Sequence, residues 1–224
     1  MKLVITGGAG FFGFHISRAF PNADLVLLDL EEIPDSELPS EARTVERVQA
    51  DVRNRTALRE AFANADAIIH AAAALPLWKA TEIRSVNLDG TRAVLEVAKE
   101  VGVPRVVHIS STAVYGIPDH HPLNEEDALH GVGPYGESKV SAESLCEKAR
   151  EAGLCVPVLR PKTFIGPERL GVFQILFEWI REGRRIPVIG DGQNRYQLLD
   201  VSDAAQAVRI LVEADSDSAN QAFN

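Results

Sequence analysis

A tyrosine and a lysine stand four positions apart in the chain, at Tyr135 and Lys139, and Ser111 precedes them. On a helix this spacing puts both side chains on one face, where they can address one substrate atom. A phenol has a reference pKa of about 10, and the ammonium of Lys139 would favour its ionised form. Ser111 would hydrogen-bond the substrate oxygen while Tyr135 removes its proton and hydride leaves the same carbon. The three residues predict alcohol–ketone redox chemistry, whereas the tyrosine and lysine alone equally suit an aromatic ring packed on a lysine stem.

A glycine-rich turn, TGGAGFFG at Thr6–Gly13, lies between a short apolar run and a helical stretch. Its glycines permit a tight turn and a close approach of backbone amides to a pyrophosphate, and a helix N-terminus adds partial positive charge. Asp29 ends the second apolar run, where a carboxylate can accept both ribose hydroxyls of an adenosine. Because Glu31 and Glu32 follow, a 2′-phosphate would meet like charge. The sequence therefore predicts a dinucleotide site that prefers NAD to NADP.

Two further segments are assigned to this cofactor site. Asp51 and Val52 follow the third apolar run and are expected at the adenine edge, and Ala71–Ala73 form a small-residue strand end. Each alone is equally well explained as a loop or core residue. The predicted cofactor-binding residues are Gly7, Gly10, Phe11, Phe12, Gly13, Asp29, Asp51, Val52, Ala71, Ala72, Ala73, Tyr135 and Lys139.

The elements that position these residues alternate along the first part of the chain. Short apolar runs are separated by amphipathic stretches, which is typical of βαβ units around a parallel sheet, and we expect an α/β, doubly wound (Rossmann) fold. The expected strands are Lys2–Thr6, Leu25–Asp29, Glu46–Gln49, Ala67–Ala71, Arg105–Ser110 and Pro157–Arg160. The expected helices are Arg55–Ala63, Val86–Val101 and Tyr135–Ala152.

The pattern changes after Arg160. A loop with prolines and glycine is followed by expected helices and strands at Val172–Glu182, Ile186–Ile189, Tyr196–Leu199 and Ser202–Ala214. The stripe Phe173, Leu176, Phe177 and Ile180 has helical spacing and is interpreted as core. We expect a dinucleotide-binding domain over residues 1–166, the start of a small substrate-binding part over 167–195, and a return to the first domain over 196–224.

Composition excludes several classes of protein. The 224 residues carry a formal net charge of −9 and no basic cluster, which argues against a nucleic-acid grip. No apolar run is long enough to span a bilayer and no signal peptide precedes the first strand, so we expect a cytoplasmic protein. The histidines His120, His121 and His130 stand beside an acidic run and are interpreted as a solvated loop, so no metal is expected.

Taken in order, these motifs resemble the extended short-chain dehydrogenase/reductase family, in its NAD-dependent epimerase/dehydratase group of the UDP-glucose 4-epimerase type. They are TGGAGFFG at Thr6–Gly13, Asp29, DV at Asp51, HAAA at His70, NLDGT at Asn87–Thr91, SSTAVYG at Ser110–Gly116, YGESK at Tyr135–Lys139, RPKTFIGP at Arg160–Pro167 and GDG at Gly190–Gly192. The resemblance implies that Ser111, Tyr135 and Lys139 are catalytic, that Lys139 also contacts the nicotinamide ribose, and that Asn87 supports the site. It further implies that NAD takes hydride from a sugar and returns it, so that NADH is transient.

Departures from the family pattern leave the substrate open. Family dehydratases have an Asp-Glu pair where this chain has Thr112 and Ala113, so elimination of water lacks its acid and base. Epimerases commonly have Asn at the position of Thr163 and Arg at the position of Tyr196, with Arg195 here one step early. The predicted substrate contacts are Trp78, Thr112, Thr163 and Arg195.

Three functions remain. Arg160, Lys162, Arg169 and Arg195 can receive a diphosphate, so a nucleotide sugar is favoured as the small-molecule substrate. The apolar segment with Leu75, Leu77 and Trp78 suits instead an NAD(P)-dependent ketone or alcohol oxidoreductase with a sterol-, flavonoid- or aldehyde-like substrate. A cofactor-binding regulator is the least favoured.

The resemblance carries two further expectations. It implies a homodimer in which the helices near Val86–Val101 and Tyr135–Ala152 pair across a two-fold axis. Family members continue beyond the equivalent of Asn224, so we expect the substrate-binding part to be incomplete in this chain.

Overall fold

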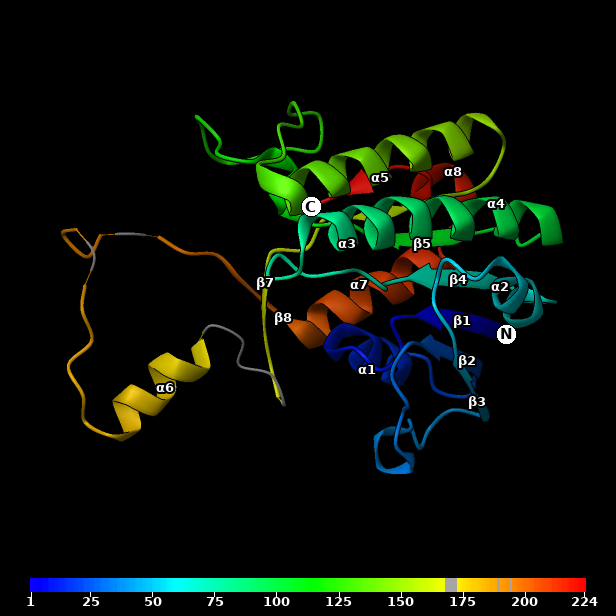
Figure 1. Cartoon of the computed structure of the whole chain (residues 1–224), viewed down its shortest axis with the longest axis horizontal. Coiled ribbons are helices and arrows are strands. Elements are labelled where there is room, and N and C mark those ends of the chain that lie inside the picture. Colours follow the sequence, from blue (N-terminus) through cyan, green and yellow to red (C-terminus); the bar gives the residue numbers. More distant parts are fainter. Residues whose placement is uncertain (168–172, 189, 194) are drawn as a thin grey trace.

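A seven-stranded parallel sheet forms the centre of the computed structural model, which describes residues 1–167, 173–188, 190–193 and 195–224. Its strand order is β3-β2-β1-β4-β5-β6-β9 (Figure 1). The strands are β1 (Lys2–Thr6), β2 (Asp24–Asp29), β3 (Thr44–Gln49), β4 (Ala67–His70), β5 (Val106–Ile109), β6 (Val158–Leu159) and β9 (Ala222–Phe223). The doubly wound parallel sheet predicted from the sequence is confirmed.

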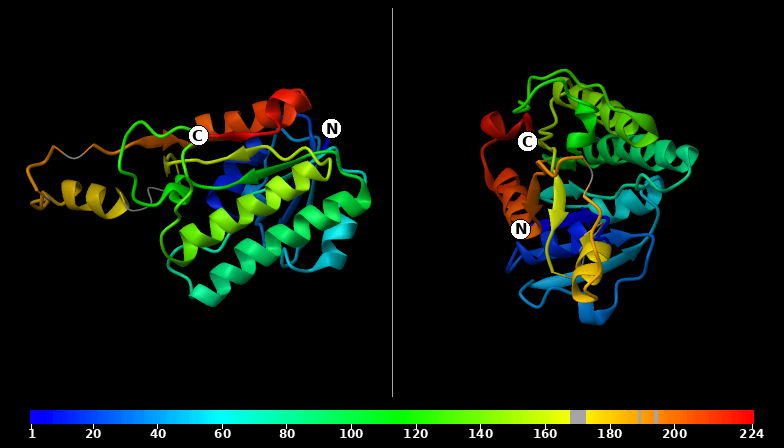
Figure 2. Two further views of the ribbon diagram at one scale, coloured as in Figure 1. Left: turned by 90° about the horizontal axis from the view of Figure 1, so that it is seen from above. Right: turned by 90° about the vertical axis from the view of Figure 1, so that its left-hand side faces the viewer.

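Helices cover both faces of the sheet. The central strands are therefore buried on both sides and consist mostly of apolar residues. One apolar cluster joins the sheet to α2 (Arg55–Phe62), α3 (Ala80–Arg84), α4 (Thr91–Val101) and α5 (Gly133–Glu151). A second cluster joins the opposite face to α1 (Phe11–Arg18) and α7 (Val201–Glu213). The two views of Figure 2 show α4 and α5 side by side on one face and α7 on the other.

The chain reverses its direction of travel across the sheet between β1 and β4. It runs outward from β1 through β2 to β3, and then returns to β4 on the other side of β1. Open α/β sheets bind ligands at such a switch point, in the crevice beyond the carboxyl ends of the strands. Thr6, Asp29 and His70 all end strands at this edge.

The helix expected at Val86–Val101 belongs to a longer helical run. It starts at Ala80, passes through a π-helical segment at Ser85–Gly90, and continues as α4 to Val101. A π-helical segment widens one turn and is frequent at functional sites. Here it carries Asn87, whose contacts are described below. Most other expected bounds differ from the structure by one or two residues.

The strand expected at Ile186–Ile189 is wrong for the part that the structure describes. Ile186–Val188 is irregular, and Ile189 lies outside the described residues. Val188 is 69% exposed, and none of the strands in the described residues pairs with this segment. The strand expected at Tyr196–Leu199 is found two residues later, as β8 (Leu198–Asp200), which pairs with β7 (Thr163–Ile165) in a separate two-stranded sheet.

The helix expected at Val172–Glu182 is α6 (Phe173–Arg181), and Val172 lies outside the described residues. Residues 173–188, here called the arm, lie between β7 and β8 and extend away from the sheet (Figures 1 and 2). Phe177 is 41% and Ile180 56% exposed. The interpretation of the apolar stripe as core is therefore wrong, because the sheet does not cover α6.

The remaining helix, α8 (Ser216–Ala219), precedes β9 at the sheet edge. Within the described ranges, no helix is both long enough and apolar enough to cross a membrane.

Candidate active site and cofactor pocket

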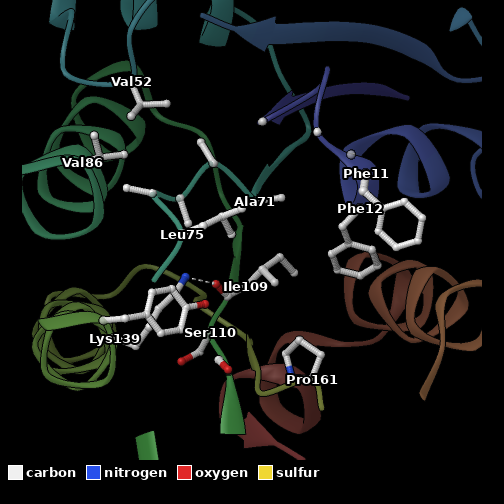
Figure 3. A pocket seen from close by; sticks show the side chains of 18 of the residues that line it. Phe11, Phe12, Val52, Ala71, Leu75, Val86, Ile109, Ser110, Lys139 and Pro161 are labelled. Atoms are coloured by element: carbon white, nitrogen blue, oxygen red, sulfur yellow. Dashed lines mark hydrogen bonds between the residues drawn. The ribbon is translucent and has the colours of Figure 1, made fainter. Parts of the chain in front are cut away.

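A cavity of about 740 Å³ opens at the carboxyl ends of the strands, a size within the usual range for small-molecule sites. In Figure 3, Phe11 and Phe12 lie on one side of it and Lys139 on the other. All of the residues predicted to bind the cofactor or act in catalysis line this cavity. Of the predicted substrate contacts, Trp78, Thr112 and Thr163 line it, whereas Arg195 is exposed and lies outside the lining.

The glycine-rich turn fits a dinucleotide for steric reasons. Gly7 has a φ of +77°, and a Cβ there would lie 2.7 Å from the backbone nitrogen of Ala72. A Cβ on Gly13 would lie 2.0 Å from the carbonyl oxygen of Gly7. Only glycine therefore lets β1, the turn and α1 pack this closely, and a helix N-terminus attracts phosphate there.

Asp29 faces the turn from the end of β2. Its Oδ2 accepts a hydrogen bond from the amide of Ala9 at 2.9 Å, and its Oδ1 accepts one from the amide of Glu31 at 3.2 Å. The carboxylate is held at the cavity wall with further lone pairs for a ligand. Asp51 also lines the cavity, but Arg53 forms an ion pair with it, and this hydrogen-bonded pair lowers the pKa of Asp51.

Lys139 is almost completely buried on α5, with 3% of its surface exposed. Its Nζ donates a hydrogen bond to the carbonyl oxygen of Ile109 at 2.9 Å, the contact drawn in Figure 3. Burial lowers the pKa of Lys139 to about 8, while the carboxylate of Glu143 acts in the opposite direction. Lys139 is therefore still largely an ammonium at neutral pH, but it loses its proton at a lower pH than an exposed lysine does.

Tyr135 and Ser111 share the cavity wall with Lys139. Burial raises the pKa of Tyr135, and its hydrogen bond with Ser111 opposes that shift. The ammonium of Lys139 donates a hydrogen bond to Ile109 and lies 5.9 Å from the centre of the Tyr135 ring. Because burial raises its pKa, the Tyr135 phenol is protonated at neutral pH.

Asn87 fixes the cavity wall that the segment after β4 forms. Its amide oxygen accepts a hydrogen bond from the backbone nitrogen of Ala74 at 2.7 Å, and its amide nitrogen donates to the Ala74 carbonyl at 3.2 Å and to Ser138 Oγ at 3.0 Å. Asn87 is 2% exposed, so these bonds take the place of water. It joins the segment after β4 to the helix that carries Tyr135.

Arg160 is not available to a diphosphate, contrary to expectation. Its Nη2 lies 2.7 Å from Glu143 Oε2 in an ion pair that is nearly inaccessible to solvent, and its Nη1 donates to the Tyr115 hydroxyl at 2.6 Å. Glu143 Oε1 accepts a hydrogen bond from Ser110 Oγ at 2.5 Å. Sequence reasoning missed Glu143, although its position four residues after Lys139 on the same helix was a usable signal.

The other cations expected at a diphosphate are dispersed. Lys162 lines the cavity, and its backbone follows Pro161, whose carbonyl accepts from the amide of Thr112 at 3.2 Å. Arg169 lies outside the described residues, and Arg195 does not reach the lining. Lys162 and Lys139 are the only cations among the described residues that line the cavity.

His120 lies on the surface, where its ring nitrogens contact Asp119 and Asp127 at 3.0 and 3.2 Å. In the part of the chain that the structure describes, no three His, Cys, Asp or Glu side chains are arranged to hold a metal ion.

The fold, the glycine turn and the acidic end of β2 define a Rossmann-type dinucleotide-binding protein. The model of the NAD-dependent epimerase/dehydratase family matches residues 3–224, and the chain belongs to this family. Membership confirms NAD as the cofactor and an enzyme family of epimerases, dehydratases and oxidoreductases.

Similar proteins differ in their activities. An uncharacterised protein of Sinorhizobium fredii, y4nG, is 34% identical over 91% of this chain and 51% of its own length. The 3beta-hydroxysteroid-dehydrogenase/decarboxylase isoform 1 of Arabidopsis thaliana is 30% identical over 91% of this chain and 51% of its own length. The structure of UDP-glucuronic acid 4-epimerase from Bacillus cereus in complex with NAD has a TM-score of 0.88 and 25% identity, covering 100% of this chain and 76% of that one. The chain thus spans about half the length of these curated relatives.

Proposed function

We propose that this chain carries the NAD-binding and catalytic part of a sugar-nucleotide epimerase-type enzyme, in which Ser111, Tyr135 and Lys139 act on a substrate hydroxyl. One observation supports this most: these three side chains line the same cavity as the glycine turn and Asp29. When bound, NAD supplies hydride transfer to and from a substrate carbon. The chain's own residues then have to handle the proton of the substrate oxygen.

We assign the transfer of this proton to the phenol of Tyr135. Burial favours its protonated form, so the phenol can donate its proton to a carbonyl oxygen and is left as phenolate, and in the reverse direction the phenolate takes the proton of a substrate hydroxyl as the alcohol is oxidised. Ser111 hydrogen-bonds with Tyr135 and can orient the substrate oxygen beside it. The ammonium of Lys139 supplies positive charge that favours the ionised phenol whenever the proton has left.

A nucleotide sugar is supported by the epimerase from Bacillus cereus, which matches the whole of this chain. Lys162 stands at the cavity, next to the segment tied to Thr112, and is the cation we assign to an anionic part of that substrate. Thr112 and Ala113 lack the carboxyl groups that elimination would need, so the proposal is epimerisation rather than dehydration.

A second candidate is an oxidoreductase for an apolar alcohol or ketone. Leu75 and Trp78 line the cavity and are 41% and 47% exposed, so an apolar substrate body would remove their surface from water. The Arabidopsis relative is named for a steroid substrate. Net formation of NADH or consumption of NADH separates this candidate from the first.

The experiment is to incubate the chain with NAD and a panel of UDP-, GDP- and dTDP-sugars. Epimers are followed by NMR and cofactor reduction by absorbance. An inverted sugar without net NADH supports the first candidate. If NAD binds but no sugar is inverted, a panel of sterols with NAD and of flavonoids and aldehydes with NADH tests the second.

Tyr135→Phe is the matched variant for either panel. Because the phenol oxygen serves proton transfer, we expect turnover to fall by about 10²-fold or more while NAD affinity stays within about twofold. Titration of NAD by calorimetry checks the second part. Equal loss of NAD binding would mean that Tyr135 holds the cofactor instead of moving the proton.

We further propose that the protein is a homodimer, as the family resemblance implied. α4 and α5 lie side by side on one face of the sheet, which makes a two-helix surface available for a two-fold contact.

A further inference from the structure

A continuous series of buried hydrogen bonds runs beneath the cavity, from the end of β1 to the helix that carries Tyr135. It starts just before the glycine turn, crosses β4, passes through the π-helical segment and ends on α5. Its members are Thr6, His70, Thr91, Asn87, Ser138 and the backbone carbonyl of Tyr135. Every one of these side chains except Tyr135 is at most 3% exposed, so water does not replace a lost member.

The direction of each hydrogen bond on the β4 side follows from one fixed donor. Thr91 Oγ1 donates its single proton to the carbonyl oxygen of Asn87 at 2.7 Å, so it must accept from His70 Nε2 at 3.0 Å. His70 is therefore protonated on Nε2. Its Nδ1 then accepts from Thr6 Oγ1 at 2.8 Å, and Thr6 Oγ1 in turn accepts from the amide of Ala72 at 3.4 Å.

The direction continues on the α5 side. Ser138 Oγ donates to the Tyr135 carbonyl at 2.7 Å, so it accepts from Asn87 Nδ2 at 3.0 Å. The same Asn87 amide holds both backbone groups of Ala74. Gly7, Ala72, Ala74 and Tyr135 all line the cavity, so the series connects the glycine turn, the segment after β4 and the Tyr135 helix.

His70 is the centre of the series, because its two ring nitrogens join the two halves. Burial lowers the pKa of His70 to about 3, and the nearby Lys139 acts in the same direction. The ring is therefore neutral, with one donor and one acceptor, throughout the range in which the protein works. A protonated ring would have two donors and would lose its bond from Thr6.

We propose that His70 is a positioning residue: its neutral ring holds the glycine turn, through Thr6, and the Tyr135 helix, through Thr91 and Asn87, in one fixed relation. The inference rests on the proposed function in one respect, that Tyr135 is the group that handles the proton. His70 itself is not among the residues that line the cavity. Its effect is the placement of Tyr135 relative to bound NAD.

His108 provides a matched control. It lies next to His70 in the sheet register, with ring centres 5.4 Å apart, and is 2% exposed. Neither of its ring nitrogens has a hydrogen-bond partner in the described structure. Replacing it removes an equally buried imidazole from the same sheet without interrupting the series.

The variants His70→Gln and His70→Asn test the two halves of the hydrogen-bond series separately. Glutamine at position 70 supplies a donor where Nε2 stands and restores the bond to Thr91, whereas asparagine supplies an acceptor where Nδ1 stands and restores the bond from Thr6. A purely structural role would make the two variants equivalent. Thr91→Val breaks the α5 half while changing little volume, in case His70→Leu does not fold.

The readout is ¹⁹F NMR of protein labelled with 3-fluorotyrosine, with and without NAD, together with NAD titration. The chain has three tyrosines, so the Tyr135 signal is assigned by its loss in Tyr135→Phe, and the exposed Tyr196 is the internal reference. We expect His70→Leu and Thr91→Val to shift or broaden the Tyr135 signal, and His70→Gln to restore it while His70→Asn does not. NAD affinity should fall by about fivefold in His70→Leu and His70→Gln, as for one lost hydrogen bond.

An unchanged Tyr135 signal in folded His70→Leu and Thr91→Val would overturn the inference, and so would an equal effect of His108→Leu. The proposed function fails separately. If the Tyr135 signal responds as expected but Tyr135→Phe retains full turnover, Tyr135 is positioned but is not the proton-transfer group.

Discussion

Asp29 shows how one side chain can serve both the fold and the ligand. It accepts the amide of Ala9 in the glycine turn, so its removal loses that bond as well as contacts to a ribose. We expect Asp29→Ala to weaken NAD binding by about 10- to 100-fold, since hydrogen bonds to charged groups are the stronger kind, and to narrow the difference between NAD and NADP. Parallel titrations of both cofactors measure this.

Two controls sharpen the Asp29 experiment. Asp29→Asn keeps an acceptor for the Ala9 amide, so it separates the role in the turn from the charge. Glu31→Ala removes a second carboxylate that lines the cavity without touching the turn. If cofactor preference changes only in Glu31→Ala, the rejection of a 2′-phosphate comes from Glu31.

The buried ammonium of Lys139 predicts two pH effects. Its pKa is about 8 in the folded protein and 10.5 in the reference state. Turnover that needs the ammonium should therefore fall above about pH 8. Between about pH 8 and 10.5 the unfolded chain binds a proton that the folded chain has lost, so stability rises with pH in that window, by up to about 3 kcal/mol.

Urea unfolding of the wild type and of Lys139→Met at several pH values measures the stability effect. The difference between the two proteins cancels the titration of other groups. We expect the free energy of unfolding of the wild type, relative to that of Lys139→Met, to rise by up to about 3 kcal/mol between pH 8 and 10.5. A flat difference would mean that Lys139 keeps its ordinary pKa in the folded protein.

At the scale of residues, the sequence predicted which side chains line the cavity. It did not predict their hydrogen-bond and ion-pair partners that lie far away in the chain. Tyr135 and Lys139 were predicted as neighbours because one helix carries both. The Asn87–Ser138 contact joins residues 51 positions apart, and the Glu143–Arg160 pair joins a helix to a strand end. No local spacing encodes such contacts, which is why Arg160 was assigned to a ligand instead of to Glu143.

At the scale of elements, the Glu143–Arg160 pair ties α5 to the end of β6. Both side chains are nearly inaccessible, and removal of one partner from a buried pair leaves the other charge uncompensated. We expect Glu143→Gln to lower the free energy of unfolding by about 3–5 kcal/mol, measured by urea denaturation.

The surface pair of Glu100 and Arg59 is the matched control, since both side chains are solvated. Glu100→Gln should give no resolvable change. The double variant Glu143→Leu with Arg160→Leu removes both charges and should recover most of the loss. A single Glu143→Gln variant as stable as the wild type would show that water or rearrangement satisfies Arg160.

Elements were predicted well where local pattern and packing agree. The apolar runs of β1, β2, β4 and β5 are buried by helices on both faces, so their composition identified them. α2 is preceded by Asn54, whose side chain accepts hydrogen bonds from the amides of Thr56 and Ala57 and so caps the helix. Ile186–Val188 is also apolar, but Pro187 has no backbone N–H to donate and no strand in the described part of the chain pairs with this segment, and a strand exists only when another backbone pairs with it.

At the scale of the whole molecule, the outward faces of α4 and α5 bear on the proposed dimer. Apart from Pro134, their exposed residues are polar or charged, namely Arg92, Glu96, Lys99, Glu100, Glu137, Ser141, Ser144, Glu147, Lys148 and Glu151. Obligate dimers usually bury an apolar face, whereas exposed charges attract at short range and are screened by salt. A dimer over these helices would therefore be held by polar contacts.

We expect light scattering at micromolar concentration to give twice the chain mass of 24.4 kDa in low salt and a shift toward the monomer at high salt. Glu96→Lys with Glu147→Lys reverses charge on both helices away from the cavity, and should dissociate the dimer without changing NAD affinity. Glu46→Lys on the exposed part of β3 is the control and should leave the mass unchanged. A monomer mass at every salt concentration contradicts the dimer, and a dimer that ignores the α4 and α5 charges requires a different surface, because electrostatic contacts cannot survive reversal of their sign.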